Sequence, residues 1–268
     1  MNNHEKFYDL LNTMSFDEID EVLSNASDNI IWRPFYNDTT IKKQYNDLID
    51  KIFESKEWPS IRNKEKGTLL ENLTQLLFER FTNHNTCQNS RTSDNEIDVI
   101  VKFNEILSPP FIKNLKLNFI CECKNKANAS IDVGMVSKLV ELCEYNNAGM
   151  GIFFSHKGVS GNGWKYGQGK IRKLFLKTNV PIISFKISEL ENFSVEGYNF
   201  YSEIKRKHQA LIDEIDYEGA ALKNYQKDNP EFFKFLLDTV KELHKLEIIS
   251  MDDLKKIENT IIEKYKFE

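Results

Sequence analysis

The sequence predicts an α/β fold in which a central mixed β-sheet is flanked by helices, with helical additions at both ends. Between residues 63 and 192, helix-type and strand-type apolar patterns alternate, as expected for a sheet with helices on its faces. Residues 1–62 and 193–268 carry helix-type patterns only. At 268 residues, the chain is long enough for a sizeable core and for more than one domain.

The first and last regions are expected to be helical for local reasons. In region 1–62, Ser15 and Glu18 have the spacing of a capping box, and apolar residues repeat with helical spacing from 41 to 53. Region 193–268 is expected to form three helices, at residues 203–225, 230–245 and 251–266.

The middle region, residues 63–192, is expected to form one sheet-centred domain. Its helices are expected near residues 66–78, 133–145 and 164–177. Its strands are expected near residues 95–101, 119–125, 150–155 and 180–185. Pro109 and Pro110 separate the first two strands, because proline cannot continue a hydrogen-bonded ladder.

Residues 119–125 form an apolar run that contains a carboxylate and a lysine two positions apart. On a strand, Glu122 and Lys124 point to one face, and Cys121 and Cys123 to the other. Unpaired charges are costly to bury, so this pattern favours a function rather than packing alone. The triplet by itself is a weak signal, since roughly five acid-x-Lys triplets are expected by chance at this composition.

Two more acids precede this run within the same region. Asp98 lies in the middle of a β-branched run at 95–101, and Glu71 is expected in the first turn of the helix at 66–78. A helix acid, a strand acid and a strand Glu-x-Lys therefore follow one another within 54 residues, from Glu71 to Lys124.

Four stretches together resemble the PD-(D/E)xK nuclease superfamily, and within it the Mrr-like restriction-endonuclease branch. They are residues 66–71, 91–99, 120–125 and 151–161. The resemblance covers residues 63–190, roughly half of the chain. The proline of the superfamily's name is replaced by Ile97, at a position that varies widely.

The resemblance implies a restriction-endonuclease-like core and a Mg²⁺-dependent endonuclease that hydrolyses DNA, in restriction or antiviral defence. Asp98 and Glu122 would bind Mg²⁺, a hard cation that prefers oxygen ligands, and Mn²⁺ is expected to substitute for it. The resemblance makes the main-chain carbonyl of Cys123 a third ligand. Glu71 would complete a second metal site or orient a metal-bound water. Lys124 would act next to the scissile phosphate.

Other interpretations remain open at this stage. Glu71 could be an acid favoured by the helix dipole, and Glu122 with Lys124 could be an ion pair on a solvated strand. Gln75 could contact DNA or face solvent. The same chemistry would serve a nuclease acting on RNA or branched DNA. A non-catalytic nucleic-acid-binding module is a further alternative, although the complete acid and lysine set argues against it.

The distribution of charge favours nucleic acid as a partner. The whole chain has a net charge of −5, but residues 60–190 carry 18 basic and 12 acidic side chains, a net charge of +6. Residues 1–59 and 191–268 are acidic, at −6 and −5. A basic block around the motif suits a phosphate backbone, although segment charge also fluctuates without function. The acidic flanks are expected to supply target choice, dimerisation or a surface for a defence-system partner.

Two features are expected to contact phosphates. One is the glycine-rich stretch at 155–163, whose backbone N–H groups could face an anion or simply connect two elements. The other is the basic stretch that follows it. The expected contacts are Lys157, Lys165, Lys170, Arg172 and Lys173. His156 is assigned no catalytic role.

Composition predicts a cytoplasmic protein without a membrane segment. No apolar stretch approaches the roughly 18 residues of a membrane span, and the first residues do not form a signal-peptide pattern. Four cysteines in a chain of this length do not make a disulfide framework. Cys121 and Cys123 are expected to pack beneath the sheet, and Cys87 and Cys143 lack the spacing of a zinc site.

Overall fold

The computed structural model describes residues 13–82, 84–91, 96–162, 165–213, 230–245 and 249–264. Internal contacts divide the chain into two compact units, residues 1–214 and 215–268. Within the described residues, no helix combines the length and apolar character needed to cross a membrane.

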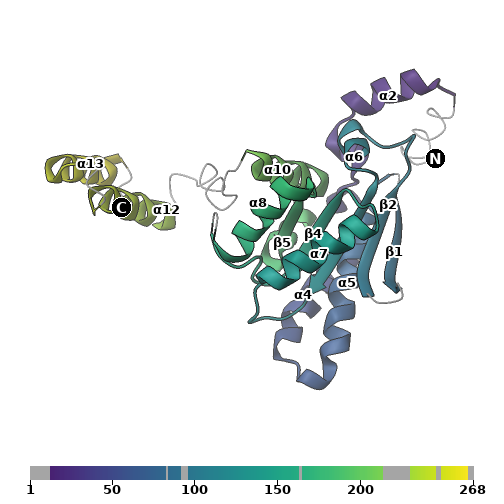
Figure 1. The fold of residues 1–268 in the computed structure, drawn as a ribbon, viewed down its shortest axis with the longest axis horizontal. Coiled ribbons are helices and arrows are strands. Elements are labelled where there is room, and N and C mark those ends of the chain that lie inside the picture. The colour runs from purple at the N-terminus through teal and green to yellow at the C-terminus, as the bar shows by residue number, and fades with distance from the viewer. Residues whose placement is uncertain are drawn as a thin grey trace. The chain divides into compact units, whose positions relative to one another are not determined.

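A five-stranded mixed sheet lies at the centre of the first unit (Figure 1). Its strands are adjacent in chain order: β1 (His84–Arg91), β2 (Glu96–Phe103), β3 (Asn118–Lys124), β4 (Met150–Ser155) and β5 (Ile182–Lys186). The pairs β1–β2 and β2–β3 are antiparallel, whereas β3–β4 and β4–β5 are parallel. The predicted α/β fold with a mixed sheet is confirmed, and the four predicted strands correspond to β2 through β5.

Strand β1 is not predicted by the sequence pattern. Its residues are mostly polar and show no alternation of apolar side chains. The strand pairs with β2 from His84–Phe103 to Arg91–Glu96 and lies at the edge of the sheet. Main-chain hydrogen bonds to a neighbouring strand do not depend on side-chain polarity, so a polar sequence can still occupy an edge.

Helices cover both faces of the sheet. In chain order, the α-helices of this unit are α2 (Phe16–Asn25), α3 (Asp28–Ile31), α4 (Thr39–Glu54), α5 (Asn63–Phe78), α6 (Pro110–Asn114), α7 (Val133–Tyr145), α8 (Tyr166–Thr178), α9 (Ile187–Leu190) and α10 (Phe200–Ile212). Short 3₁₀ turns occur at Phe35–Asn37, Ser55–Glu57, Ser60–Arg62 and Glu191–Ser194. The helix predicted at residues 164–177 corresponds to α8, and its first predicted residue, 164, lies outside the described residues.

The two faces of the sheet carry two separate apolar clusters. On one face, α7 and α8 pack against Ile120 and Phe153. On the other, α5 packs against Val99 and Cys121, and Figure 1 shows this helix behind the strands that α7 crosses in front. Every residue of β4 is buried, because this inner strand has helices on both sides.

The segments that flank the predicted core contribute to the same apolar cluster as α5. Trp32 Nε1 donates a hydrogen bond to the carbonyl of Leu77 at 2.8 Å, and both residues are buried. Tyr45 Oη, on α4, donates to the carbonyl of Leu190 at 2.6 Å. Phe200 on α10 is also buried in this cluster. The boundaries predicted at residues 62 and 192 therefore do not coincide with the boundary between the compact units.

The second unit contains two described helices, α12 (Pro230–Lys245) and α13 (Met251–Lys264). Both agree with the predicted ranges to within two residues. Val240, Leu254 and Ile261 form a small buried cluster between them. The helix predicted at 203–225 is described only as α10, which ends at Ile212, and residues 214–229 lie outside the described residues.

We expect Tyr45→Phe to lower the free energy of unfolding by about 1–2 kcal/mol, because the buried Leu190 carbonyl would lose its donor. The matched control is Tyr145→Phe, since the Tyr145 side chain is 76% exposed and its hydroxyl can reach water. Urea denaturation of the two variants measures the difference. Equal midpoints for the two variants would show that the Tyr45 hydrogen bond adds nothing to stability.

Candidate active site

Asp98, Glu122 and Lys124 meet where β2 separates from β3. The register of these strands runs from Lys102–Asn118 to Val99–Cys121. Asp98 is the next residue beyond the last pair, and its Oδ2 atom accepts a hydrogen bond of 2.7 Å from the main-chain N–H of Cys123. The structure thus brings the strand acid predicted from the sequence next to the Glu-x-Lys run.

Glu122 and Lys124 form a close ion pair on the face of β3 covered by α7. Lys124 Nζ lies 2.5 Å from Glu122 Oε1. Glu122 is only 7% exposed, so the pair does not lie on a solvated strand as one interpretation of the sequence required. The second carboxylate oxygen, Glu122 Oε2, is buried and has no hydrogen-bond partner among the described residues. A buried carboxylate oxygen without a partner is costly, and a cation would remove that cost.

Burial and like charges shift the acid–base properties of this group. Burial, together with the Glu122 carboxylate, raises the pKa of Asp98 to about 6, although the Cys123 N–H opposes the shift. For Lys124, burial alone would lower the pKa. The neighbouring Glu122 and Asp98 carboxylates outweigh burial and raise the pKa of Lys124, so this side chain remains protonated.

Glu71 belongs to the same electrostatic group, but not at the position expected. Helix α5 begins at Asn63, so Glu71 lies in its third turn and not in its first turn as predicted. The dipole of the helix N-terminus therefore does not account for this acid, because that effect fades within one turn. Glu71 is close enough to contribute to the raised pKa of Asp98 and that of the Cys123 thiol.

The cysteines of β3 lie on the face of the strand covered by α5, opposite to the face of Glu122 and Lys124. Cys121 and Cys123 are buried in the cluster beneath the sheet, which confirms the prediction of their packing. The Cys123 Sγ atom lies 3.3 Å from Thr74 Oγ1 on α5. Burial raises the pKa of both cysteine thiols well above the usual value, so they remain neutral. Any contribution of Cys123 to a cation site would come from its carbonyl.

Within the described part of the chain, no group of three or more His, Cys, Asp or Glu side chains is arranged to hold a metal ion. The acids at the strand ends offer two carboxylates, Asp98 and Glu122, with Glu71 nearby. Their chemistry still fits a hard cation, because oxygen ligands and an unpartnered buried carboxylate oxygen are present.

Lys138 is a feature of this site that the sequence analysis missed. A cavity of 130 Å³ is lined by Glu122, Lys124 and four residues of α7, one of which is the exposed Lys138. Helical spacing gives a partial signal, since Lys138 is three residues after Met135, which also lines the cavity. The helix pattern alone does not reveal which charged residue borders the buried face.

The expected phosphate-contacting residues fall into two groups. Lys157, Lys165 and Lys173 are exposed, and Lys170 is half-buried. Arg172 is only 6% exposed, so it does not contribute to an exposed basic face as predicted. It is one of the buried residues of α8, together with Ile171.

The glycine-rich stretch at 155–163 uses some of its N–H groups internally. The N–H of Gly158 donates to Ser155 Oγ at 3.0 Å, and the N–H of Ser160 donates to the carbonyl of Ile131 at 2.9 Å. These two amides are therefore already satisfied and do not favour a phosphate cradle at their positions.

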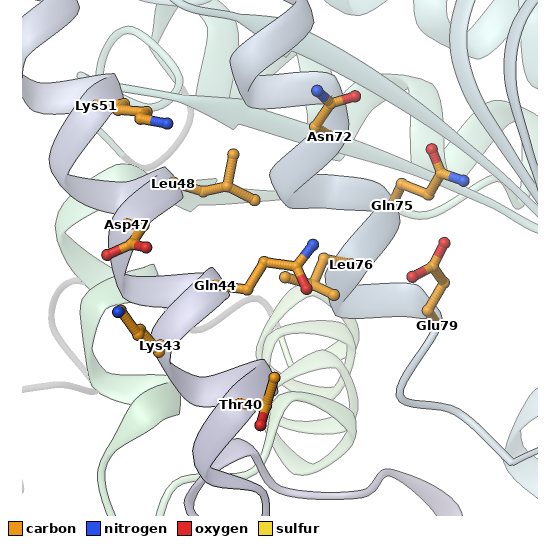
Figure 2. A pocket seen from close by; sticks show the side chains of 10 residues that line it. All are labelled: Thr40, Lys43, Gln44, Asp47, Leu48, Lys51, Asn72, Gln75, Leu76 and Glu79. Carbon is orange, nitrogen blue, oxygen red and sulfur yellow. The ribbon is translucent and has the colours of Figure 1, made fainter.

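A separate hollow of 480 Å³ lies between α4 and α5, and none of the proposed site acids lines it. Figure 2 shows the two helices running antiparallel, with Gln44, Asn72 and Gln75 among the side chains that line the hollow. Gln75, which is one turn after Glu71 on α5, therefore lines this hollow. The lining also contains two lysines and two acids, Lys43, Lys51, Asp47 and Glu79.

No protein-family model, curated protein or solved structure matches this chain. The resemblance to PD-(D/E)xK nucleases therefore stays a prediction.

The raised pKa of Asp98 has a consequence for stability in metal-free protein. The pKa of Asp98 is about 6 in the folded protein and 3.8 in the unfolded chain. The folded state therefore becomes less stable as the pH rises from about 4 to 6, because the folded protein must then bury a charged carboxylate. We expect Asp98→Asn to remove up to about 3 kcal/mol of this cost at pH 8 and almost none at pH 4. Thermal unfolding in EDTA across this range measures the difference. A stabilisation that does not depend on pH would contradict the electrostatic cause.

Proposed function

We propose that this protein is a metal-dependent endonuclease with a restriction-endonuclease-like core that hydrolyses DNA. The observation that carries the proposal is the cluster at the ends of β2 and β3. Asp98 and Glu122 lie together, one buried oxygen of Glu122 has no hydrogen-bond partner among the described residues, and Lys124 lies 2.5 Å from the other oxygen. A role in restriction or defence against foreign DNA rests on the motif resemblance alone.

The residues present fit a divalent cation. Asp98 and Glu122 would hold Mg²⁺ or Mn²⁺ with the Cys123 carbonyl, and Glu71 would act from the third turn of α5. The ion, when bound, supplies charge neutralisation and a nucleophile at neutral pH. The protein's own contribution is to keep these acids on rigid elements and to keep bulk water from Glu122.

Lys124 has a different task from the acids. Its raised pKa keeps the ammonium group charged, and its ion pair with Glu122 fixes the position of Nζ. A charged group in a fixed position can stabilise negative charge that develops on the phosphate oxygens in the transition state. Lys138, across the same small cavity, offers a second cation for a non-reacting phosphate oxygen.

We expect Asp98→Asn and Glu122→Gln each to reduce Mg²⁺-dependent cleavage of supercoiled plasmid to background, because each removes one charged oxygen ligand. Glu141→Gln is the matched control, since Glu141 is exposed on α7 and does not line the cavity. Agarose-gel assays with Mg²⁺, Mn²⁺ or EDTA measure the effect, with single-stranded DNA and RNA as parallel substrates. Full activity in either site variant, or cleavage of RNA alone, would contradict the proposed site or the proposed substrate.

We expect Lys124→Met to lower turnover by about 10²-fold or more while DNA affinity changes little, because the lysine acts on developing charge. Lys126→Met is the control, since Lys126 is exposed two residues further along. Single-turnover rates and metal-free binding assays separate the two quantities. An equal loss of affinity and rate would show that Lys124 binds the ground state instead.

A further inference from the structure

A second cavity, of 490 Å³, opens at the carboxyl ends of β3 and β4. Its walls come from separate segments of the first unit. Phe53 is near the end of α4, and Lys56 is in the 3₁₀ turn that follows it. Asn128 comes from the chain after β3, and His156 and Lys157 directly follow β4.

Hydrogen bonds connect this cavity to the strand that carries the proposed site. Lys124 pairs with Ser155 at the end of the β3–β4 ladder. In the next position along each strand, His156 Nε2 donates to Asn125 Oδ1 at 2.8 Å. His156 is therefore one residue beyond Ser155, the partner of Lys124. Since a strand advances about 3.3 Å per residue, the cavity wall at His156 lies close to Lys124 along the sheet. A substrate strand that crosses this edge of the sheet would reach both places.

The charges of the cavity favour an anion. Lys56 and Lys157 are exposed, and neither forms a salt bridge with a carboxylate of the described residues. Among the described residues that line the cavity, Glu57 is the one acid, so this lining has a net positive charge. The α4–α5 hollow of Figure 2 has a similar volume, but its two lysines are balanced by two acids. Volume alone therefore does not distinguish the two cavities, whereas charge does.

The cavity also offers a flat apolar surface beside the positive charge. Phe53 is half-buried, and Lys56 Nζ lies 4.3 Å from the centre of its ring. Burial, with a contribution from Lys56, lowers the pKa of His156 to about 4, so this ring is uncharged at neutral pH. An aromatic ring beside two ammonium groups that form no salt bridge with a described carboxylate matches the two parts of a nucleotide, a base that stacks and a phosphate that carries charge.

We propose that this cavity binds one unpaired nucleotide of the strand that is cleaved, with the phosphate between Lys56 and Lys157 and the base against Phe53. The identity of that strand as substrate rests on the proposed function. The binding itself depends only on the residues of the cavity. A free mononucleotide shares this chemistry, and the test separates it from a nucleotide within a strand.

The test measures binding of a fluorescein-labelled 12-nucleotide single-stranded DNA to the full chain in EDTA, by anisotropy, over a range of salt concentrations. We expect Lys56→Ala with Lys157→Ala to weaken binding and to reduce the slope of log K against log salt by about 0.7, from the loss of one neutralised phosphate. Phe53→Leu should weaken binding about tenfold through lost stacking and leave the slope unchanged. Lys43→Ala with Lys51→Ala, in the α4–α5 hollow, is the matched control and should change neither quantity.

Wild-type affinity and slope in the Lys56/Lys157 double variant would overturn the inference, as would an absence of oligonucleotide binding by the wild-type protein. Tighter binding of adenosine 5′-monophosphate than of the oligonucleotide would also overturn it, because the cavity would then serve a free nucleotide. The two proposals fail separately. A protein that binds through these residues but never cleaves with Mg²⁺ or Mn²⁺ removes the nuclease function and leaves the cavity assignment in place.

Discussion

The hydrogen bond from the Cys123 N–H to the Asp98 carboxylate is the interaction on which the site depends. Beyond the Val99–Cys121 pair, the main chain of β2 no longer pairs with β3. A buried N–H group at that point would be costly without an acceptor. The side chain of Asp98 supplies the acceptor, so the strands can separate while the acid is held at the place where they part.

This arrangement places more negative than positive charge in a poorly solvated position. Glu122 and Glu71 both contribute to the raised pKa of Asp98, and Lys124 forms an ion pair with Glu122. The raised pKa of Asp98 reflects the free-energy cost of the negative charge that Lys124 does not balance. A proton or a bound cation can lower that cost. Strong shifts caused by burial and like charges are typical of functional sites, although structural ion pairs produce them too. Glu122 Oε2 has no hydrogen-bond partner in the part of the chain that the structure describes, and this favours a cation here over a purely structural pair.

The sequence predicted the parts of this fold that depend on local pattern. Four strands, the helix at 133–145 and the helices at 230–245 and 251–264 follow from periodicity and breaking residues. Strand β1 could not be predicted, because its polar residues are held by pairing with β2 rather than by an apolar face. The extended start of α5 was missed for a related reason, since its first residues, 63–65, are polar and give no apolar periodicity.

The same limit applies to the candidate site. Alternation on a strand is a local property, so the shared face of Glu122 and Lys124 could be read from the sequence. The neighbouring strands that join Asp98 to them were expected from resemblance rather than from pattern. Burial of Arg172 and the position of Lys138 beside the cavity depend on how α8 and α7 rotate against the sheet. The orientation of each helix is set by packing between segments distant in the sequence, and the pattern within one segment does not reveal that packing.

Asn125 connects the segment after α4 and the start of α5 to the strand that carries the site. Its Nδ2 group donates to the carbonyl of Lys66 at 2.7 Å and to Ser55 Oγ at 3.2 Å, while its Oδ1 accepts from His156. One side chain, next to Lys124, thus joins the α4–α5 connection to the ends of β3 and β4. The lysines and the aromatic ring of the 490 Å³ cavity lie on the same segments, the end of α4 with the turn after it and the chain after β4. A strand bound there would therefore be placed relative to Lys124 by hydrogen-bonded elements, and sites built on rigid elements position a reacting group more accurately than sites on free loops.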